Sequence, residues 1–160
     1  MRKTLIAAVA LVALATAFAA VAAGGTRSAA QRVRIEVSGA DPFGFVLRAT
    51  SRGQVRSDTG HVTFCCWTNS SVTRAGAKLD VSNPRLTFAG EHGTLKIRNR
   101  IEWVDLPDGW SVFTGTWKVV GGTRAYAGFS GHGRVAGAWA PESDPGRDLR
   151  IRLFGFLEAK

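Results

Sequence analysis

Apolar and polar side chains alternate along most of the chain after residue 31, with a period of two residues. The segment 94–104 is the clearest example, because apolar residues and Asn99 take one face and charged residues take the other. Such alternation is typical of a β-strand with one buried and one solvated face. It predicts strands in the segments 32–37, 43–50, 61–67, 79–81, 86–88, 94–104, 110–120, 131–139 and 148–158.

The segments between these strands are short, and no part of the chain keeps a helical period over three turns. Residues 51–60 are polar and contain glycine, which predicts a loop or a weak continuation of a strand. Residues 70–77 are small and polar, which predicts a loop or a short helical turn.

Strands with one apolar face and short connections predict an all-β fold built as an antiparallel meander. Eight such strands can close into a small barrel without exposed edges, and a two-sheet sandwich is the alternative. Glycines inside the strands, at Gly115, Gly137 and Gly155, favour the single eight-stranded barrel. Strongly coiled sheets place glycine where a strand bends or where another backbone comes close.

The first 23 residues have the three parts of a secretory signal peptide. Arg2 and Lys3 precede an alanine-rich apolar run at 5–21, and small residues surround Ala22. The run is short and only weakly hydrophobic for a membrane anchor, so we expect cleavage. The predicted organisation is a signal peptide at 1–23, a flexible mature N-terminus at 24–31 and a β-barrel domain at 32–160. The protein is therefore expected to be secreted, to the extracellular space or a bacterial cell envelope.

The chain is basic, with a formal net charge of +9 at pH 7. Removal of the signal peptide takes away Arg2 and Lys3 and leaves +7. The arginines are spread over many segments without a block of five or six, which is typical of a solvated basic exterior. On several strands they fall opposite the aromatic face, so we expect no nucleic-acid partner.

The segment 115–133 is rich in glycine, with a strand leading into Gly121-Gly122 and a second strand after Gly128. The pattern lacks the G-K-[ST] ending of a phosphate-binding loop. We interpret Gly121-Gly122 as a tight hairpin turn that needs positive φ angles.

The sequence VVGGTRAYAGFSGHG at 119–133 resembles the GGTGxYxG-type segment of small secreted bacterial proteins with an allene oxide cyclase-like or dirigent-like barrel. Arg124 departs from that pattern, which has a further glycine there. The resemblance implies an eight-stranded barrel with an apolar cavity. In the plant allene oxide cyclases and dirigent proteins, such a cavity steers a cyclisation or a radical coupling. The matching positions are Gly121, Gly122, Thr123, Tyr126, Gly128, Gly131 and Gly133.

One polar residue and several aromatic residues are candidates for a ligand site inside this barrel. Asn99 interrupts an apolar face between Ile97 and Ile101, so it either orients a ligand or bonds to a neighbouring strand. The predicted inward aromatic residues either pack the core or line an apolar pocket. The candidate cavity-facing residues are Asn99, Trp103, Phe113, Trp117 and Trp139.

Cys65 and Cys66 are the only cysteines and are adjacent. Three states are open: a strained vicinal disulfide, an intermolecular bridge, or free thiols. If strand parity holds through them, Cys66 shares the face of Val62 and Phe64. No C-x-x-C occurs, and the three histidines have no metal-ligand spacing, so we expect no metal and no cofactor.

Three functions fit these features. The first is a non-enzymatic module that binds a small hydrophobic molecule in an apolar cavity. The second is a cyclase or isomerase acting in the same cavity, for which we assign no catalytic residue. The third is a cell-surface interaction module that uses its basic exterior, and we expect it to bind anionic wall polymers in a salt-sensitive way.

Overall fold

The computed structural model describes residues 29–39, 42–55, 57–141 and 149–159. The predicted signal peptide and residues 24–28 of the predicted N-terminus lie outside these ranges. The described chain forms ten strands and one 3-10 helix, η1 (Arg124–Tyr126). The strands are β1 (Gln31–Ser38), β2 (Phe43–Ala49), β3 (Asp58–Cys65), β4 (Asn69–Arg74), β5 (Ala77–Ser82), β6 (Arg85–Gly90), β7 (Gly93–Asp105), β8 (Ser111–Gly122), β9 (Phe129–Trp139) and β10 (Leu149–Ala159).

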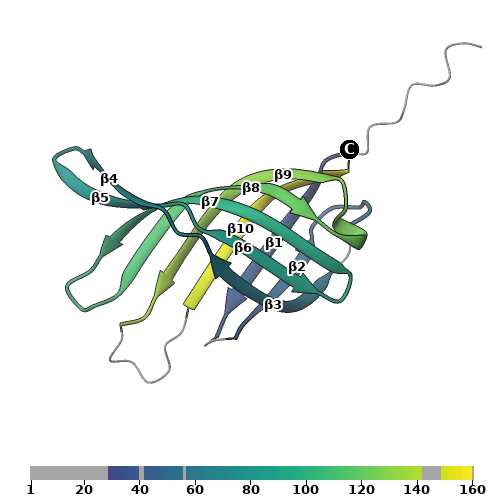
Figure 1. Cartoon of the computed structure of the whole chain (residues 1–160), viewed down its shortest axis with the longest axis horizontal. Coiled ribbons are helices and arrows are strands. Elements are labelled where there is room, and N and C mark those ends of the chain that lie inside the picture. Colours follow the sequence, from purple (N-terminus) through teal and green to yellow (C-terminus); the bar gives the residue numbers. More distant parts are fainter. Residues whose placement is uncertain (1–28, 40–41, 56, 142–148, 160) are drawn as a thin grey trace, which may run out of the picture.

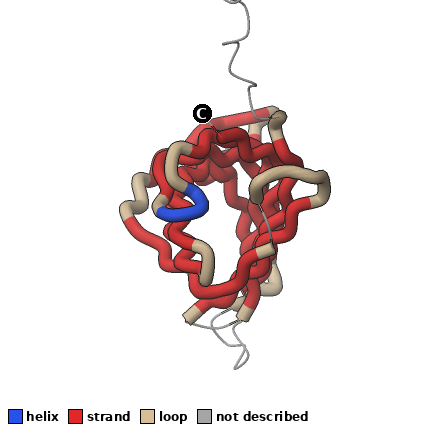
Figure 2. The backbone as a smooth tube through the Cα atoms, turned by 90° about the vertical axis from the view of Figure 1, so that its right-hand side faces the viewer, coloured by secondary structure: helices blue, strands red, loops and turns tan. Residues whose placement is uncertain are grey.

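The strands form one antiparallel sheet that closes on itself. Their order is β4-β5-β7-β6-β3-β2-β1-β10-β9-β8, and a further pairing of β7 with β8 completes a ring of eight strands. Figure 2 shows this ring from the end at which η1 lies. The predicted eight-stranded barrel is therefore confirmed, and the sandwich alternative is wrong.

The hairpin β4–β5 lies outside the ring and projects away from it (Figure 1). It covers most of the segment for which a loop or short helical turn was predicted, and that prediction is wrong. The hairpin turns at Ala75 and Gly76, whose φ angles of 47° and 80° are those of a two-residue turn with both residues left-handed. Antiparallel pairing from Asn69↔Ser82 to Arg74↔Ala77 holds β4 as a strand, although none of its residues is buried.

Strand alternation fills the barrel with side chains. On β1, Val33, Ile35 and Val37 are buried, whereas Arg32 on the opposite face is exposed. The same parity places the buried face of every barrel strand inward. The core consists of Val33, Ile35, Val37, Phe45, Leu47, Val55, Val62, Leu86, Phe88, Leu95, Ile97, Ile101, Phe113, Trp117, Tyr126, Val135, Leu149, Ile151, Leu153 and Leu157.

One end of the barrel is closed by buried polar groups. The amide of Gln31 donates to the carbonyl oxygens of Ser51 and Val55, and its oxygen accepts from the Val55 backbone N–H at 2.8 Å. These bonds hold Val55 in the barrel end, where it is buried. We refer to this end, with Gln31, Asp58 and η1, as the polar end.

Asp58 is the centre of the polar end. Its buried carboxylate accepts a hydrogen bond from the Tyr126 hydroxyl at 2.8 Å and from the backbone N–H groups of Thr59 and Glu91, both at 2.9 Å. His92 Nδ1 lies 3.3 Å from the same carboxylate. These bonds tie the start of β3 to the β6–β7 turn and to η1.

The hydrogen bonds also set the charge states of Asp58 and Tyr126. Burial by itself raises the pKa of Asp58, but the bonds from Tyr126, His92 and the backbone outweigh it and hold the pKa below its ordinary value of 3.8. Burial, followed by the bond to Asp58, raises the pKa of Tyr126 well above its ordinary value of 10.0. Asp58 is thus ionised and Tyr126 neutral at neutral pH.

The glycine-rich segment turns the chain later than we predicted from the sequence. Gly121 and Gly122 end β8 and do not have positive φ, so the predicted tight turn at this pair is wrong. The direction changes at η1, with left-handed φ angles at Arg124 (51°) and Gly128 (74°). Glycine is needed at position 122 because the backbone of Tyr126 packs closely against it: a Cβ there would lie 2.8 Å from the carbonyl carbon of Tyr126.

Replacing Tyr126 by phenylalanine removes a hydrogen bond to a buried charge, so we expect Tyr126→Phe to lower the free energy of unfolding by about 1.5–3 kcal/mol at pH 7. Since the folded-state pKa of Asp58 is lowered, its contribution is present above pH 3.8 and is lost as the pH falls through the folded-state value. The difference between wild type and variant should therefore shrink in acid. Urea unfolding at pH 7 and pH 3 measures it, and a pH-independent difference would contradict this account.

Arg124 occupies a left-handed position at which the resembling segments have glycine. A non-glycine residue there costs roughly 1 kcal/mol, so Arg124→Gly should raise the free energy of unfolding by about that amount. Arg124→Ala is the matched control, because alanine has the same left-handed penalty and should give no gain. Equal urea midpoints for the two variants would refute the explanation.

Candidate functional site

The end of the barrel opposite η1 is lined by aromatic side chains, and we call it the aromatic mouth. Its members are linked in pairs, for example Phe43 edge-on to Phe64 with ring centroids 5.4 Å apart. The rings of Trp103 and Phe113 lie 4.5 Å apart. The aromatic mouth comprises Phe43, Phe64, Trp67, Trp103, Phe113 and Trp139.

Asn99 lies behind these rings. It sits where the neighbour of β7 changes from β6 to β5, and its backbone N–H donates to the carbonyl oxygen of Pro84 at 2.9 Å. The residue is only 2% exposed, yet its side-chain oxygen Oδ1 has no hydrogen-bond partner among the described residues. Asn99 lines a void of about 10 Å³ together with Trp67, Trp103, Phe113 and Trp139. That volume is close to the smallest that holds one water molecule.

The structure brings four of the five predicted cavity-facing residues together at this void: Asn99, Trp103, Phe113 and Trp139. Trp117 is buried deeper in the barrel and does not line it. Its indole N–H points to two backbone carbonyl oxygens, 3.1 Å from that of Arg134 and 3.2 Å from that of Phe154. Gly133 and Gly155 leave room for this indole, because a Cβ on either would lie 2.6 Å or less from it.

Our sequence reasoning missed Phe43, Phe64 and Trp67 as site residues of the aromatic mouth, and Trp67 is the one that strand parity could not have found. Its side chain is 41% exposed and stacks on Phe64, with ring centroids 6.3 Å apart. It follows Cys66, whose φ of 61° lies in the left-handed region. The strand therefore ends at Cys65, and Trp67 folds back over the barrel end in a way that parity cannot predict.

The two cysteines are free and exposed in this structure. The turn at Cys66 ends strand parity, so Cys66 does not share the inward face of Val62 and Phe64, and that expectation is wrong. A hydrogen bond with the Cys66 thiol raises the pKa of the Cys65 thiol. Neither cysteine lines the void, although Cys66 directly precedes Trp67.

The void has an acceptor but no acid or base. Its lining consists of Phe64, Trp67, Pro84, Asn99, Ile101, Trp103, Phe113, Trp139, Leu149 and Ile151, and none of these side chains titrates. The buried ionisable pair Asp58 and Tyr126 belongs to the opposite, polar end. The mouth can therefore offer apolar contact and one hydrogen-bond acceptor.

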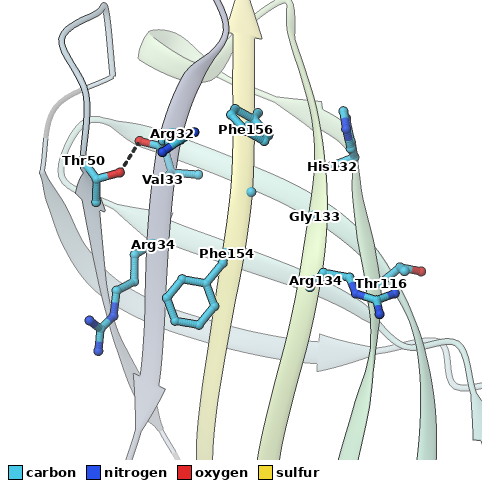
Figure 3. Close-up of a pocket in the computed structure, with 11 residues that line it drawn as sticks. Arg32, Val33, Arg34, Thr50, Thr116, His132, Gly133, Arg134, Phe154 and Phe156 are labelled. Carbon is cyan, nitrogen blue, oxygen red and sulfur yellow. Dashed lines mark hydrogen bonds between the residues drawn. The ribbon is translucent and has the colours of Figure 1, made fainter.

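A second and much larger hollow lies on the outer wall of the barrel, over β1, β10, β9 and β8 (Figure 3). We call it the outer hollow, and its volume is about 660 Å³. Phe154 and Phe156 stand on β10 in its middle, between arginines of β1 on one side and His132 and Arg134 of β9 on the other. It is lined by Arg32, Val33, Arg34, Thr50, Thr116, His132, Gly133, Arg134, Phe154, Gly155 and Phe156.

The outer hollow corrects one sequence-based argument. We placed the arginines opposite the aromatic face, but Phe154 and Phe156 share the outward face of β10 with Arg150 and Arg152. The signal was present in the sequence, because both phenylalanines alternate with the inward Leu153, Gly155 and Leu157. Their clustering with cations of β1 and β9 depends on strand register and could not be read from one strand.

The chain matches no protein-family model, no curated protein and no solved structure. Among the described residues, no helix is long and apolar enough to cross a membrane. The function is therefore inferred from the residues of the two sites themselves.

Asn99 keeps an unpaired acceptor in an apolar environment, which lowers stability. We expect Asn99→Leu, which has a similar volume, to raise the free energy of unfolding by about 1–2 kcal/mol. Gln31→Leu is the matched control, since Gln31 is equally buried but fully hydrogen-bonded, and its loss should destabilise. Urea unfolding compares the two, and destabilisation by Asn99→Leu would mean that Oδ1 has a partner.

Proposed function

We propose that this is a secreted, non-enzymatic protein that binds a small apolar molecule at the aromatic mouth of its barrel. The observation that carries the proposal is the buried, unpaired Oδ1 of Asn99 behind a group of aromatic side chains. A buried polar atom normally has a partner, and an exception of this kind marks a place where a ligand can supply one. The mouths of β-barrels are also common positions for small-molecule sites.

The size of the void decides how a ligand would enter. A void of about 10 Å³ cannot hold an organic molecule, so a side chain has to give way. Trp67 is the candidate, because it is 41% exposed and its ring stacks on Phe64. The left-handed turn at Cys66 beside it is the kind of strained backbone that is found at ligand clamps. Displacement of Trp67 would uncover the aromatic mouth without unpacking the core.

The ligand that fits best is a planar aromatic molecule with an N–H or O–H donor. The rings of the mouth would supply apolar and edge-to-face contact, and Asn99 Oδ1 would accept the hydrogen bond. The alternative function, a cyclase or isomerase, needs an acid, a base or a charged group near the reacting atoms. The described lining of the void has none, so binding is favoured over catalysis.

Indole and 1-methylindole test the proposal, because 1-methylindole has an N–CH3 group in place of the N–H donor of indole. We expect Asn99→Leu to weaken indole binding by about 2- to 13-fold, the worth of one hydrogen bond, and to leave 1-methylindole unchanged. Trp67→Ala should strengthen the binding of both compounds by vacating their space. Titration calorimetry measures the affinities.

Trp110→Ala is the control for Trp67→Ala, since Trp110 is half-buried and lies outside the void. Two results would overturn the proposal. One is that neither wild type nor Trp67→Ala binds either compound. The other is that Asn99→Leu weakens the binding of indole and of 1-methylindole by the same factor.

A further inference from the structure

We propose that the outer hollow is a second binding site, for a small amphipathic anion with an apolar or aromatic body and one carboxylate or phosphate group. The anionic group would be bound by Arg134, and the body would lie against Phe154 and Phe156. This site is on the outside wall of the barrel and is independent of the aromatic mouth.

The outer hollow has the dimensions of a ligand site. Its volume of about 660 Å³ is in the range of pockets that hold small molecules, whereas the void at Asn99 is not. The backbone of Gly133 and Gly155 lines it between the outward side chains of β9 and β10, which pair at these two residues. A body of one or two fused rings would find room there.

Two aromatic rings are partly exposed in the outer hollow. Phe154 is 47% exposed and Phe156 is 39% exposed, although both belong to a central strand of the barrel wall. Solvent-exposed phenylalanine costs hydration free energy, and adjacent exposed aromatic groups mark surfaces that are covered in use. Their rings supply the apolar contact that the proposal requires.

Strand register places a basic residue on either side of each ring. Phe154 pairs with Arg34 on β1 and with Arg134 on β9, and Phe156 pairs with Arg32 and with His132. Neighbouring strands are about 4.8 Å apart, so each ring has a basic side chain on either side. On the β1 side the guanidinium carbons lie over the rings, that of Arg34 5.5 Å from the Phe154 centroid and that of Arg32 5.8 Å from the Phe156 centroid.

The cations are not all available to a ligand. Glu36 pairs with Arg34 and lies 3.4 Å from Arg152. By contrast, no acidic side chain in the described part of the chain pairs with Arg134 or Arg32. Because Arg32 already covers a ring, Arg134 is the free guanidinium that faces the hollow, and its planar fork suits a carboxylate or phosphate.

The core holds the outer hollow in shape. The single indole N–H of Trp117 is shared between the carbonyl oxygens of Arg134 and Phe154, which are the two residues proposed to bind the head and the body. Trp117 therefore positions these residues on adjacent strands from inside the barrel. A site supported in this way needs little reordering when a ligand binds.

A small ligand is favoured over a polymer or a bilayer. Farther round the barrel, Arg100 is neutralised by Glu102, 3.1 Å away, which also pairs with Arg74 at 2.9 Å. Other cations of the wall have no acidic partner among the described residues, for example Arg98 and Lys118, which are register neighbours on β7 and β8. The preference for a small ligand therefore rests on the volume of the hollow and on the two rings within it. A bilayer surface is flat and would not fill a hollow of this volume.

Calorimetry with 1-naphthyl phosphate tests the inference, with uncharged 1-naphthalenemethanol as the matched compound. We expect wild type to bind the phosphate at least about 10-fold more tightly than the alcohol. Arg134→Gln should remove most of that difference in affinity. Phe154→Ala or Phe156→Ala should weaken the binding of both compounds about 5-fold or more. All three side chains are at the surface, so the variants retain the core.

Matched controls separate the site from general attraction. Arg98→Gln changes the net charge as Arg134→Gln does, but Arg98 is exposed on β7 outside the hollow, and this variant should bind like wild type. Val120→Ala is the apolar control, because Val120 is 47% exposed on β8 and does not line the hollow. Asn99→Leu should also leave the affinity unchanged, which distinguishes the outer hollow from the aromatic mouth.

Three results would overturn the inference: equal weakening by Arg98→Gln and Arg134→Gln, equal affinity for phosphate and alcohol, or no binding of 1-naphthyl phosphate. Two further probes assign the surface to another partner. Vesicles of phosphatidylglycerol and phosphatidylcholine in a 1:3 ratio (about 25% anionic lipid) test a membrane, and a single-stranded oligothymidine tests nucleic acid. Binding of either that requires Phe154 and Arg134, without binding of 1-naphthyl phosphate, would replace the proposal.

Discussion

The pairing of β7 with β8 is the interaction on which the rest of the molecule depends. It runs from Leu95↔Gly122 to Asp105↔Ser111 and joins the two ends of an eight-strand ring. Once the ring is closed, period-two alternation divides every strand into an inside and an outside. The interior of an eight-stranded barrel is only just wide enough for its own side chains, and here these fill it. Sites for other molecules are therefore left to the two ends and the outer wall.

The polar end and the aromatic mouth differ in whether their buried polar groups are hydrogen-bonded. At the polar end, Gln31 and Asp58 are buried and meet enough donors and acceptors to bridge loops that are distant in sequence. At the aromatic mouth, Asn99 is equally buried and its Oδ1 is unpaired. Stability is thus concentrated where the glycine-rich segment meets β3, and the opposite end carries a group that lowers it. Proteins commonly lose stability where they bind, because a group optimised for a ligand is not optimised for the fold.

Much of the fold could be predicted from the sequence, because burial on one face leaves a period that can be read directly. The inward face of β7, with Asn99 and Trp103, follows from such a period. Strand β4 of the hairpin could not be predicted, because both of its faces are largely exposed and its sequence therefore has no apolar alternation. Gly121 and Gly122 misled for another reason, since glycine serves close approach as well as tight turns. Of the candidate sites, the inward members of the mouth were predictable, whereas Trp67 and the outer hollow depend on how separate segments meet.

The projecting hairpin has a consequence for how copies of the protein meet. A closed barrel offers no free strand edge, but β4 is paired on one side only among the described strands. Addition of a further strand, whether from a second copy or from an unfolded chain, could extend the described sheet there. The sequence of β4, Asn69 to Arg74, has five polar residues and a single valine, which is poor material for strand-to-strand association. The polar sequence of β4 therefore disfavours strand addition at the open edge, and closure of the barrel prevents it along the rest of the described sheet.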